Sequence, residues 1–154
     1  MTPPRLVVVA HNIRSMANVG SLFRSADAFG VAKIFLCGYT GIPPRNEIAK
    51  VALGAETWIP WEHAKLTHRV VERLQREGYT VVALECTKQS VPLSRLPATK
   101  KIALIVGNEV QGVSKPILKR AEVVAHIPML GKKESLNVGV AAGCALYAVR
   151  YGRS

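Results

Sequence analysis

Several polar residues and glycines follow short apolar runs that are typical of buried strands. His11-Asn12 follows one such run, Glu85-Cys86-Thr87 a second, Gly107-Asn108-Glu109 a third, and the segment 128–137 a fourth. In open α/β sheets, ligands bind beyond the carboxyl ends of the strands. The sequence therefore predicts one site built from several loops, in which carboxylate, amide and main-chain groups bind and orient a ligand.

The acidic residues are too dispersed for several kinds of catalysis. Asp27 is the only aspartate, and the glutamates lie far apart along the chain. Two-metal catalysis and paired-carboxylate hydrolysis both need clustered carboxylates, so neither is expected and no metal is predicted. The sequence also contains no GxGxxG and no GxxxxGK[ST] motif, the usual phosphate-binding loops of dinucleotide and nucleotide-triphosphate enzymes.

Length, composition and charge restrict the class of protein further. The chain has 154 residues, of which 49% are hydrophobic, and a formal charge of +11. This is the size of a single domain, 1–154, with enough apolar residues for a packed core. No apolar run has the length of a membrane span or the pattern of a signal peptide, so the cytoplasm is the expected location. The dispersed basic residues favour a polyanionic partner over a merely soluble cationic protein.

The cysteines do not indicate a covalent framework. Cys37, Cys86 and Cys144 lie far apart and show no CxxC spacing. Neither a disulfide framework nor a zinc site is expected from them. Each is interpreted as a small buried hydrophobic side chain.

The elements that must position the polar residues alternate between strands and helices. Continuous apolar runs predict buried strands, and apolar residues at helical spacing predict the helices between them. The expected strands are 6–10, 33–37, 80–86, 102–106 and 123–127, with a short strand or turn at 58–61. The expected helices are 18–29, 46–53, 64–76, 114–120 and 135–149, with Asn18, Asn46 and Ser135 as N-caps. This alternation predicts an α/β fold with a mostly parallel sheet.

The last expected helix is unusually slim. Its small residues include Gly139, Ala142, Gly143 and Ala145. A glycine inside a helix costs about 1 kcal/mol relative to alanine, so a close approach by another backbone segment is expected. An ordinary helix laid on a sheet is the alternative.

Three segments carry a family resemblance by their order and spacing. They are 18–30, NVGSLFRSADAFG; 105–114, IVGNEVQGVS; and 127–138, IPMLGKKESLNV. Together they resemble the three motifs of the SpoU, or TrmH-like, RNA ribose methyltransferases of the SPOUT superfamily, over nearly the whole chain. The resemblance implies a mostly parallel sheet flanked by helices, with a deep C-terminal trefoil knot that binds S-adenosylmethionine. It also implies a homodimer that completes the site, with Trp58, Trp61 and the last helix as possible interface residues.

The implied reaction is methylation of a ribose 2′-hydroxyl in RNA, with transfer RNA favoured over ribosomal RNA. Methyl transfer from a sulfonium mainly needs orientation. A catalytically silent, knotted RNA-binding module and a flavodoxin-like domain for a small ligand are the alternatives. Retention of Arg24, Glu109 and Asn137 weighs against the first, and the charge of +11 weighs against the second.

The resemblance assigns catalytic roles to Arg24, Asn18, Glu109, Ser135 and Asn137. Arg24 would hold a phosphate and stabilise the developing alkoxide, because an arginine side chain resists deprotonation near neutral pH. Glu109 would position Arg24 or the cofactor, or would be a surface acid. Asn18 and Ser135 could instead serve only as helix caps.

Two further sets of residues are predicted, a cofactor-binding set and a basic set in or beside the predicted site loops. The expected cofactor-binding residues are Leu84, Thr87, Gly107, Gly112, Ile127, Met129 and Leu136. Gly107 would let adenine lie on the main chain, and Ile127 and Leu136 would form apolar walls. The expected RNA-binding residues are Arg14, Arg24, Arg45, Lys132 and Lys133, each of which could also be a solvated surface charge. Val110 and Gly139 depart from the family, which often has glycine and serine at these positions.

Overall fold

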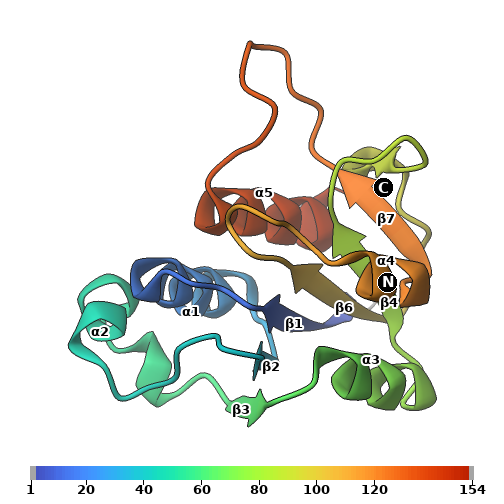
Figure 1. Ribbon diagram of the computed structural model, residues 1–154. Helices are drawn as coiled ribbons and strands as arrows, with labels where there is room; N and C mark the ends of the chain where they lie inside the picture. Colours follow the sequence, from blue (N-terminus) through green and yellow to red (C-terminus); the bar gives the residue numbers. More distant parts are fainter. Residues whose placement is uncertain (1–2, 153–154) are drawn as a thin grey trace.

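The protein is a seven-stranded sheet with helices on both faces, shown in Figure 1 as a computed structural model that describes residues 3–152. The strand order is β3-β2-β1-β6-β4-β7-β5, and all six pairings between neighbouring strands are parallel. The predicted fold class, a mostly parallel α/β sheet flanked by helices, is confirmed.

The elements follow one another in strand and helix alternation. The strands are β1 (Arg5–His11), β2 (Lys33–Cys37), β3 (Trp61–Ala64), β4 (Thr80–Leu84), β5 (Val91–Pro92), β6 (Lys101–Val106) and β7 (Val123–His126). The helices are α1 (Met16–Phe29), α2 (Asn46–Ala52), α3 (Thr67–Arg76), α4 (Lys115–Arg120) and α5 (Val138–Tyr151). Two short 3-10 turns, η1 (Ala55–Thr57) and η2 (Leu93–Arg95), complete the list.

Each face of the sheet carries its own apolar cluster. Val8 and Leu104 belong to the cluster under α1, α2 and α5, whereas Val9 and Ile105 belong to the cluster under α3 and α4. Successive residues of a strand point to opposite faces, so a strand covered on both sides is apolar at every position. This explains the continuous apolar runs of β1 and β6.

The slim composition of α5 allows a close approach to α1. A Cβ placed on Gly139 would come within 2.8 Å of the Cβ of Ser21, which is closer than real side chains approach. The contact of Gly143 with Ser25 is looser, because a Cβ there would lie 3.4 Å from the Ser25 Oγ. The expected close approach is therefore confirmed at Gly139, where a serine would not fit.

The end of α5 is tied to the start of the sheet by one side chain. Arg150 donates hydrogen bonds to the carbonyl oxygens of Pro4 at 2.7 Å, Phe29 at 2.9 Å and Gly30 at 3.1 Å. These bonds join residues more than a hundred positions apart, and they fix the end of α5 to the end of α1 and to the start of β1.

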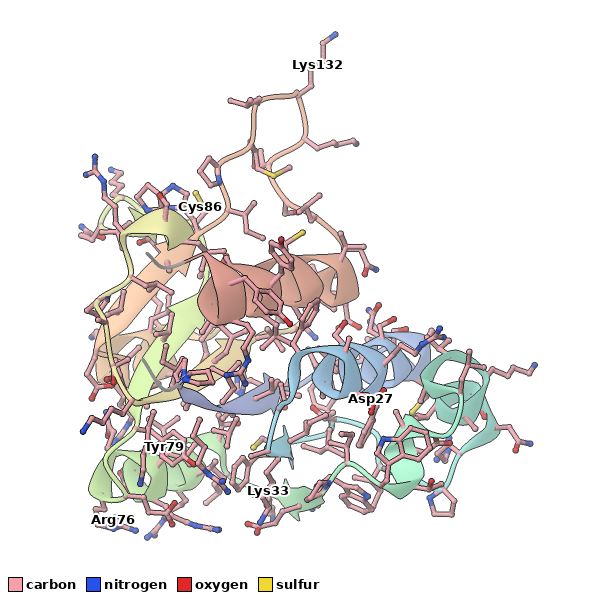
Figure 2. All side chains as sticks on the ribbon, turned by 180° about the vertical axis from the view of Figure 1, so that it is seen from behind. Asp27, Lys33, Arg76, Tyr79, Cys86 and Lys132 are labelled. Carbon is pink, nitrogen blue, oxygen red and sulfur yellow. The ribbon has the colours of Figure 1, made fainter. Side chains whose placement is uncertain are left out.

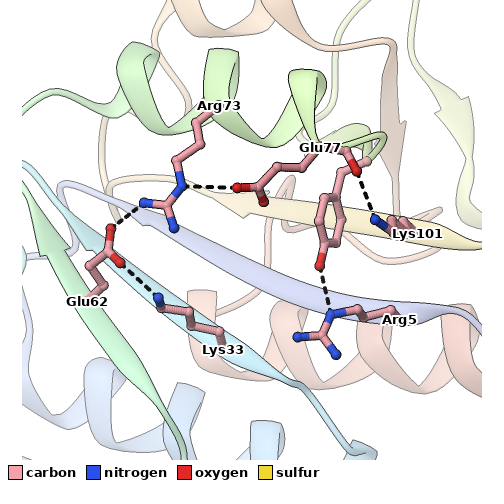
Figure 3. Close-up of polar contacts among 7 residues, drawn as sticks. Arg5, Lys33, Glu62, Arg73, Glu77 and Lys101 are labelled. Atoms are coloured by element: carbon pink, nitrogen blue, oxygen red, sulfur yellow. Dashed lines mark hydrogen bonds and ion pairs between the residues drawn. The ribbon is translucent and has the colours of Figure 1, made fainter.

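A chain of ion pairs links β2, β3 and α3, away from the carboxyl ends of the strands (Figure 3). Glu62 lies 2.8 Å from the Nζ of Lys33 and 2.7 Å from the Nη1 of Arg73, and Arg73 also pairs with Glu77 at 3.3 Å. The hydrogen bond from Lys33 lowers the pKa of Glu62, burial opposes this shift, and Arg73 lowers the pKa further. The edge strand β3 is thereby fixed to its neighbours.

None of the three expected N-caps takes that position. Ser15, rather than Asn18, caps α1, because its extended backbone lets Oγ accept from the N–H of Asn18 at 3.2 Å. Asn137, rather than Ser135, caps α5, because its Oδ1 accepts from two backbone N–H groups of the first turn at 2.9 and 3.2 Å. Asn18 thus lies inside the first turn of α1, and Asn137 lies just before α5, two residues later than the predicted cap.

Other boundaries also differ from the prediction. α2 begins at Asn46 itself, with Arg45 as the N-cap residue. The strand expected at 58–61 begins only at Trp61 and extends to Ala64, the first residue of the next expected helix, since 61–64 pair with β2 as an edge strand. As a result α3 begins at Thr67, and the short β5 and η2 were not predicted.

The cysteines divide into two kinds. Cys37 is buried as expected, and burial raises its pKa to about 12 against the effect of a hydrogen bond with Thr67. Cys86 and Cys144 are exposed, so the prediction of burial is wrong for both. Cys86 lies beyond the end of β4, and Cys144 lies on an outward face of α5. In the described part of the chain, no helix is long and apolar enough to cross a membrane.

Candidate active site

A pocket of about 480 Å³ opens at the carboxyl ends of β4, β6 and β7, the edge at which the sequence predicted a site. Its volume lies within the range of about 300–1,000 Å³ typical of small-molecule sites. Six of the seven residues predicted to bind the cofactor line it: Leu84, Gly107, Gly112, Ile127, Met129 and Leu136. Thr87 does not belong to the lining.

The turn 107–113 forms one wall of the pocket and depends on two glycines. A Cβ on Gly107 would collide with the backbone of Gly112 and Val113. Gly112 has a φ of +69°, and a Cβ there would collide with the carboxylate of Glu85. The missing side chain of Gly107 therefore faces the backbone of its own turn, which is a different reason for glycine from the adenine contact that was expected.

Asn108 holds this turn from within. Its Oδ1 accepts from the N–H groups of Val110 and Gln111, both at 2.9 Å. Its Nδ2 donates to the carbonyl oxygen of Asn12 at 2.9 Å and to the hydroxyl of Tyr39 at 2.7 Å. One buried amide thus joins the loops that follow β1, β2 and β6.

Glu85 holds the same turn from the neighbouring strand. Its Oε2 accepts from the N–H of Val113 at 2.9 Å, and its Oε1 accepts from the N–H of Cys86 at 3.2 Å. Glu85 and Asn108 were expected at strand ends, but no individual role in the site was predicted for either residue. Their signal was a polar side chain directly after an apolar strand, next to a glycine turn.

Glu109 joins the three motif segments. Its carboxylate accepts from the N–H of Arg14 at 2.9 Å, the N–H of Ser15 at 2.7 Å and the Nδ2 of Asn18 at 2.9 Å. Asn18 in turn accepts from the Nδ2 of Asn137 at 3.1 Å. The structure therefore brings Asn18, Glu109 and Asn137 together, although they lie up to 119 positions apart.

The hydrogen bonds to Glu109 favour its charged form. Burial raises the pKa of Glu109, but the bonds from Arg14, Ser15 and Asn18 outweigh it and hold the pKa below its ordinary value. An ionised carboxylate at the start of α1 also interacts favourably with the positive end of the helix dipole. Glu109 thus fixes the start of the helix that carries Arg24.

Arg24 itself is free. It is exposed on α1, does not line the pocket, and makes no hydrogen bond or ion pair with any residue that the structure describes. At 1.5 Å per residue, it lies about 9 Å along the helix from Asn18. Glu109 and Arg24 share no hydrogen bond or ion pair in the described structure, so the expected positioning of Arg24 by Glu109 would have to act through the helix.

The second wall of the pocket is the segment that projects between β7 and α5 (Figure 1). Among the described residues, none forms a hydrogen bond or ion pair with residues 129–136. Ser135 lines the pocket and Lys132 lies at the end of the projection (Figure 2). Lys133 is also exposed.

Two further arginines predicted to bind RNA, Arg14 and Arg45, lie on other segments than this projection. Arg14 is exposed and meets Glu109 only through its main chain. Arg45 lines a separate groove with Trp61 and pairs with Glu47 at 3.8 Å. The expected RNA-binding residues therefore do not form one patch. Within residues 3–152, no three His, Cys, Asp or Glu side chains are grouped to hold a metal ion.

Solved structures of RNA methyltransferases share this fold. An AdoMet-bound rRNA methyltransferase from Sinorhizobium meliloti superposes with a TM-score of 0.91 at 28% identity, over 99% of this chain and 58% of that one. The A. aeolicus TrmH/SpoU tRNA modifying enzyme superposes with a TM-score of 0.86 at 32% identity, over 94% of this chain and 73% of that one.

Sequence comparison gives the family. The model of the SpoU rRNA Methylase family matches residues 5–147, so the chain belongs to this family. The 23S rRNA (guanosine-2'-O-)-methyltransferase RlmB of Coxiella burnetii is 31% identical over 150 residues, which are 97% of this chain and 60% of that protein. The tRNA (guanosine(18)-2'-O)-methyltransferase of Aquifex aeolicus is 33% identical over 149 residues, which are 96% of this chain and 70% of that protein. The family assignment is confirmed.

Proposed function

We propose that the protein transfers a methyl group from S-adenosylmethionine to a ribose 2′-hydroxyl of RNA. The observation that carries this proposal is the junction of Glu109, Asn18 and Asn137, which unites the three motif segments beside the pocket. Membership of the SpoU family and the names of the relatives support the reaction class.

The pocket fits the proposed donor. Leu84, Ile127 and Leu136 give it apolar surface, and the turn 107–113 gives it backbone groups. It is also lined by three carboxylates, those of Glu85, Glu109 and Glu134, in a chain with a net charge of +11. Such a lining suits a cationic sulfonium ligand. S-adenosylmethionine supplies an activated methyl group, so the protein has to orient it toward the ribose oxygen.

Arg24 is the residue proposed to meet the RNA at the reacting sugar. Its guanidinium has no partner among the described residues, so its donors are available to a phosphate and to charge that develops on the 2′-oxygen. Ser135 and Asn137 line the pocket and would contact the ribose or the donor. The deep trefoil knot implied by the family stays a prediction.

A homodimer is proposed to complete the site. Val140, Tyr147 and Tyr151 form an exposed apolar stripe along α5, and the exposed Leu136 lies just before that helix. A second copy would cover these four side chains. Light scattering is expected to show a dimer. Val140→Arg, which places a charge in the stripe, should give a monomer with reduced methyl transfer. Leu66→Arg, at an exposed apolar side chain outside the stripe, is the control that should stay dimeric.

Transfer RNA is the favoured substrate and the cytoplasm the expected location. Labelled methyl transfer from S-adenosylmethionine into unfractionated tRNA and rRNA tests the proposal, with nucleoside mass spectrometry to locate the methyl group. We expect a 2′-O-methylated nucleoside with the wild type and far less of it with Arg24→Ala. Tight binding of donor and RNA without any transfer would instead favour a catalytically silent RNA-binding module.

A further inference from the structure

Trp58 is a large aromatic side chain that neighbouring residues hold in place although it is exposed to solvent. It is 57% exposed, in a chain with only 6% aromatic residues. Its Nε1 donates a hydrogen bond to Oδ1 of Asp27 at 2.7 Å. A Cβ on Gly54 would lie 3.1 Å from the Cζ3 of the indole, so the other end of the ring rests against this glycine. The indole is therefore fixed at two points while most of its surface faces solvent.

Asp27 places this indole next to Arg24. The two residues are three positions apart on α1, so their Cβ atoms lie about 5–6 Å from each other. Asp27 lies on the flank of α1 whose Gly20 packs against α2, and Ser21 lies on the opposite flank against α5. Figure 2 shows Asp27 on the side of α1 that faces the segment after α2. Arg24 thus has the fixed indole on one side.

We propose that Trp58 is a stacking platform for a base of the RNA, next to the phosphate held by Arg24; this rests on the proposed function. Proteins that read unpaired RNA stack splayed bases on aromatic side chains. An indole that is already immobilised loses little conformational freedom when a base stacks on it. The bond to Asp27 occupies the one polar group of the ring, which leaves its apolar face for a base.

A second copy of the chain is the competing occupant of this surface. The larger apolar surface lies on α5, on the other flank of α1, and suits a copy better. The net charge of +11 also favours a polyanion as a binding partner of the chain. These two observations favour RNA at Trp58.

The test compares Trp58→Ala, Trp58→Phe and the control Leu66→Ala for binding to unfractionated tRNA. Trp58→Ala should bind about 5- to 150-fold more weakly, as expected for the loss of one base–aromatic stack. Trp58→Phe should restore most of the affinity, because it keeps a ring. The slope of log affinity against log salt and the affinity for S-adenosylmethionine should not change, since stacking neutralises no phosphate.

A second measurement uses the folded protein with the indole intact. In Trp61→Phe, Trp58 is the only tryptophan, and tRNA should quench its emission. Wild-type affinity in Trp58→Ala, or no quenching in Trp61→Phe, would overturn the stacking role while the wild type still binds and methylates RNA. Loss of the dimer in Trp58→Ala would assign the surface to a second copy and also overturn it. If the wild type neither binds nor methylates RNA, the proposed function is wrong, and the stacking role that rests on it is wrong as well.

Discussion

The two walls of the pocket are built differently. The turn 107–113 is held by the buried amide of Asn108, by the carboxylate of Glu85 and by two glycines that pack against neighbouring groups. The segment 129–136 has no hydrogen bond or ion pair to any other described residue. Both walls follow apolar strands of the same sheet, so the difference lies in the polar side chains around them.

The polar side chains around the pocket accordingly fall into two kinds: fixed groups, which bond to the chain itself, and free groups, which do not. Glu85, Asn108 and Glu109 satisfy backbone donors of the chain itself and give the pocket its shape. Arg24 and Lys132 are exposed and have no partner among the described residues. We expect changes to the fixed groups to alter stability and cofactor affinity. Changes to the free groups should alter RNA binding and methyl transfer alone.

The largest effect is expected at Arg24. Arg24→Ala should lower methyl transfer about 100- to 1,000-fold, as removal of one donor to a developing oxyanion does in other enzymes. The free energy of unfolding and the affinity for S-adenosylmethionine should stay unchanged, because the side chain makes no bond within the described chain. Arg76→Ala, at an exposed arginine at the end of α3, is the control. A destabilised Arg24→Ala would break the division into fixed and free groups.

Glu109→Gln should act mainly on stability. An amide cannot accept from all three donors at this position, so the free energy of unfolding should fall by about 1–2 kcal/mol in denaturant titrations. The pKa of Glu109 is lowered in the folded state, so its contribution is complete above the ordinary value of 4.5 and is lost as the pH falls through the folded-state value. The variant should lack this acid-dependent loss. An equal acid sensitivity in both proteins would contradict the assignment.

Glu85→Ala and Glu134→Ala compare the two walls directly, since both carboxylates line the pocket. Glu85 bonds the turn 107–113, whereas Glu134 has no hydrogen-bond partner among the described residues. Glu85→Ala should weaken S-adenosylmethionine binding about 10-fold in calorimetry, because a lost charge-assisted bond costs about 1.5 kcal/mol or more. Glu134→Ala should stay within about twofold of the wild type. Equal losses would mean that the carboxylate charge matters and the turn does not.

The smallest effect is expected on the projecting segment. Replacing Lys132 and Lys133 together by alanine should weaken tRNA binding modestly and reduce the slope of log affinity against log salt by about 1.4, if each lysine meets one phosphate. Binding of S-adenosylmethionine should not change. An unchanged salt slope would show that this segment contacts something other than the RNA backbone.

Much of the fold could be predicted from local sequence patterns. The buried strands β1 and β6 read as continuous apolar runs because they are covered on both faces. The edge strand β3 was predicted too early in the sequence, because the half-buried Glu62 and the exposed His63 give no such run. Its place depends on pairing with β2 and on ion pairs that only the folded chain brings together.

The sequence predicted which segments form the candidate site, but not which of their side chains contact one another. Asn18 and Ser135 fit the pattern of a helix cap, yet Ser15 and Asn137 take those positions. The pattern could not show that Asn18 faces Glu109, because that contact spans 91 positions. The sequence also could not show that Gly107 packs against the backbone of Gly112 and Val113, because that contact exists only in the folded turn.

The most direct measurement is a structure of the protein with S-adenosylmethionine bound. The account predicts the donor between the turn 107–113 and the segment 127–137, with its methyl group directed toward an Arg24 guanidinium from this chain or from a second copy. A donor bound elsewhere, or a methyl group that no Arg24 of either copy approaches, would contradict it.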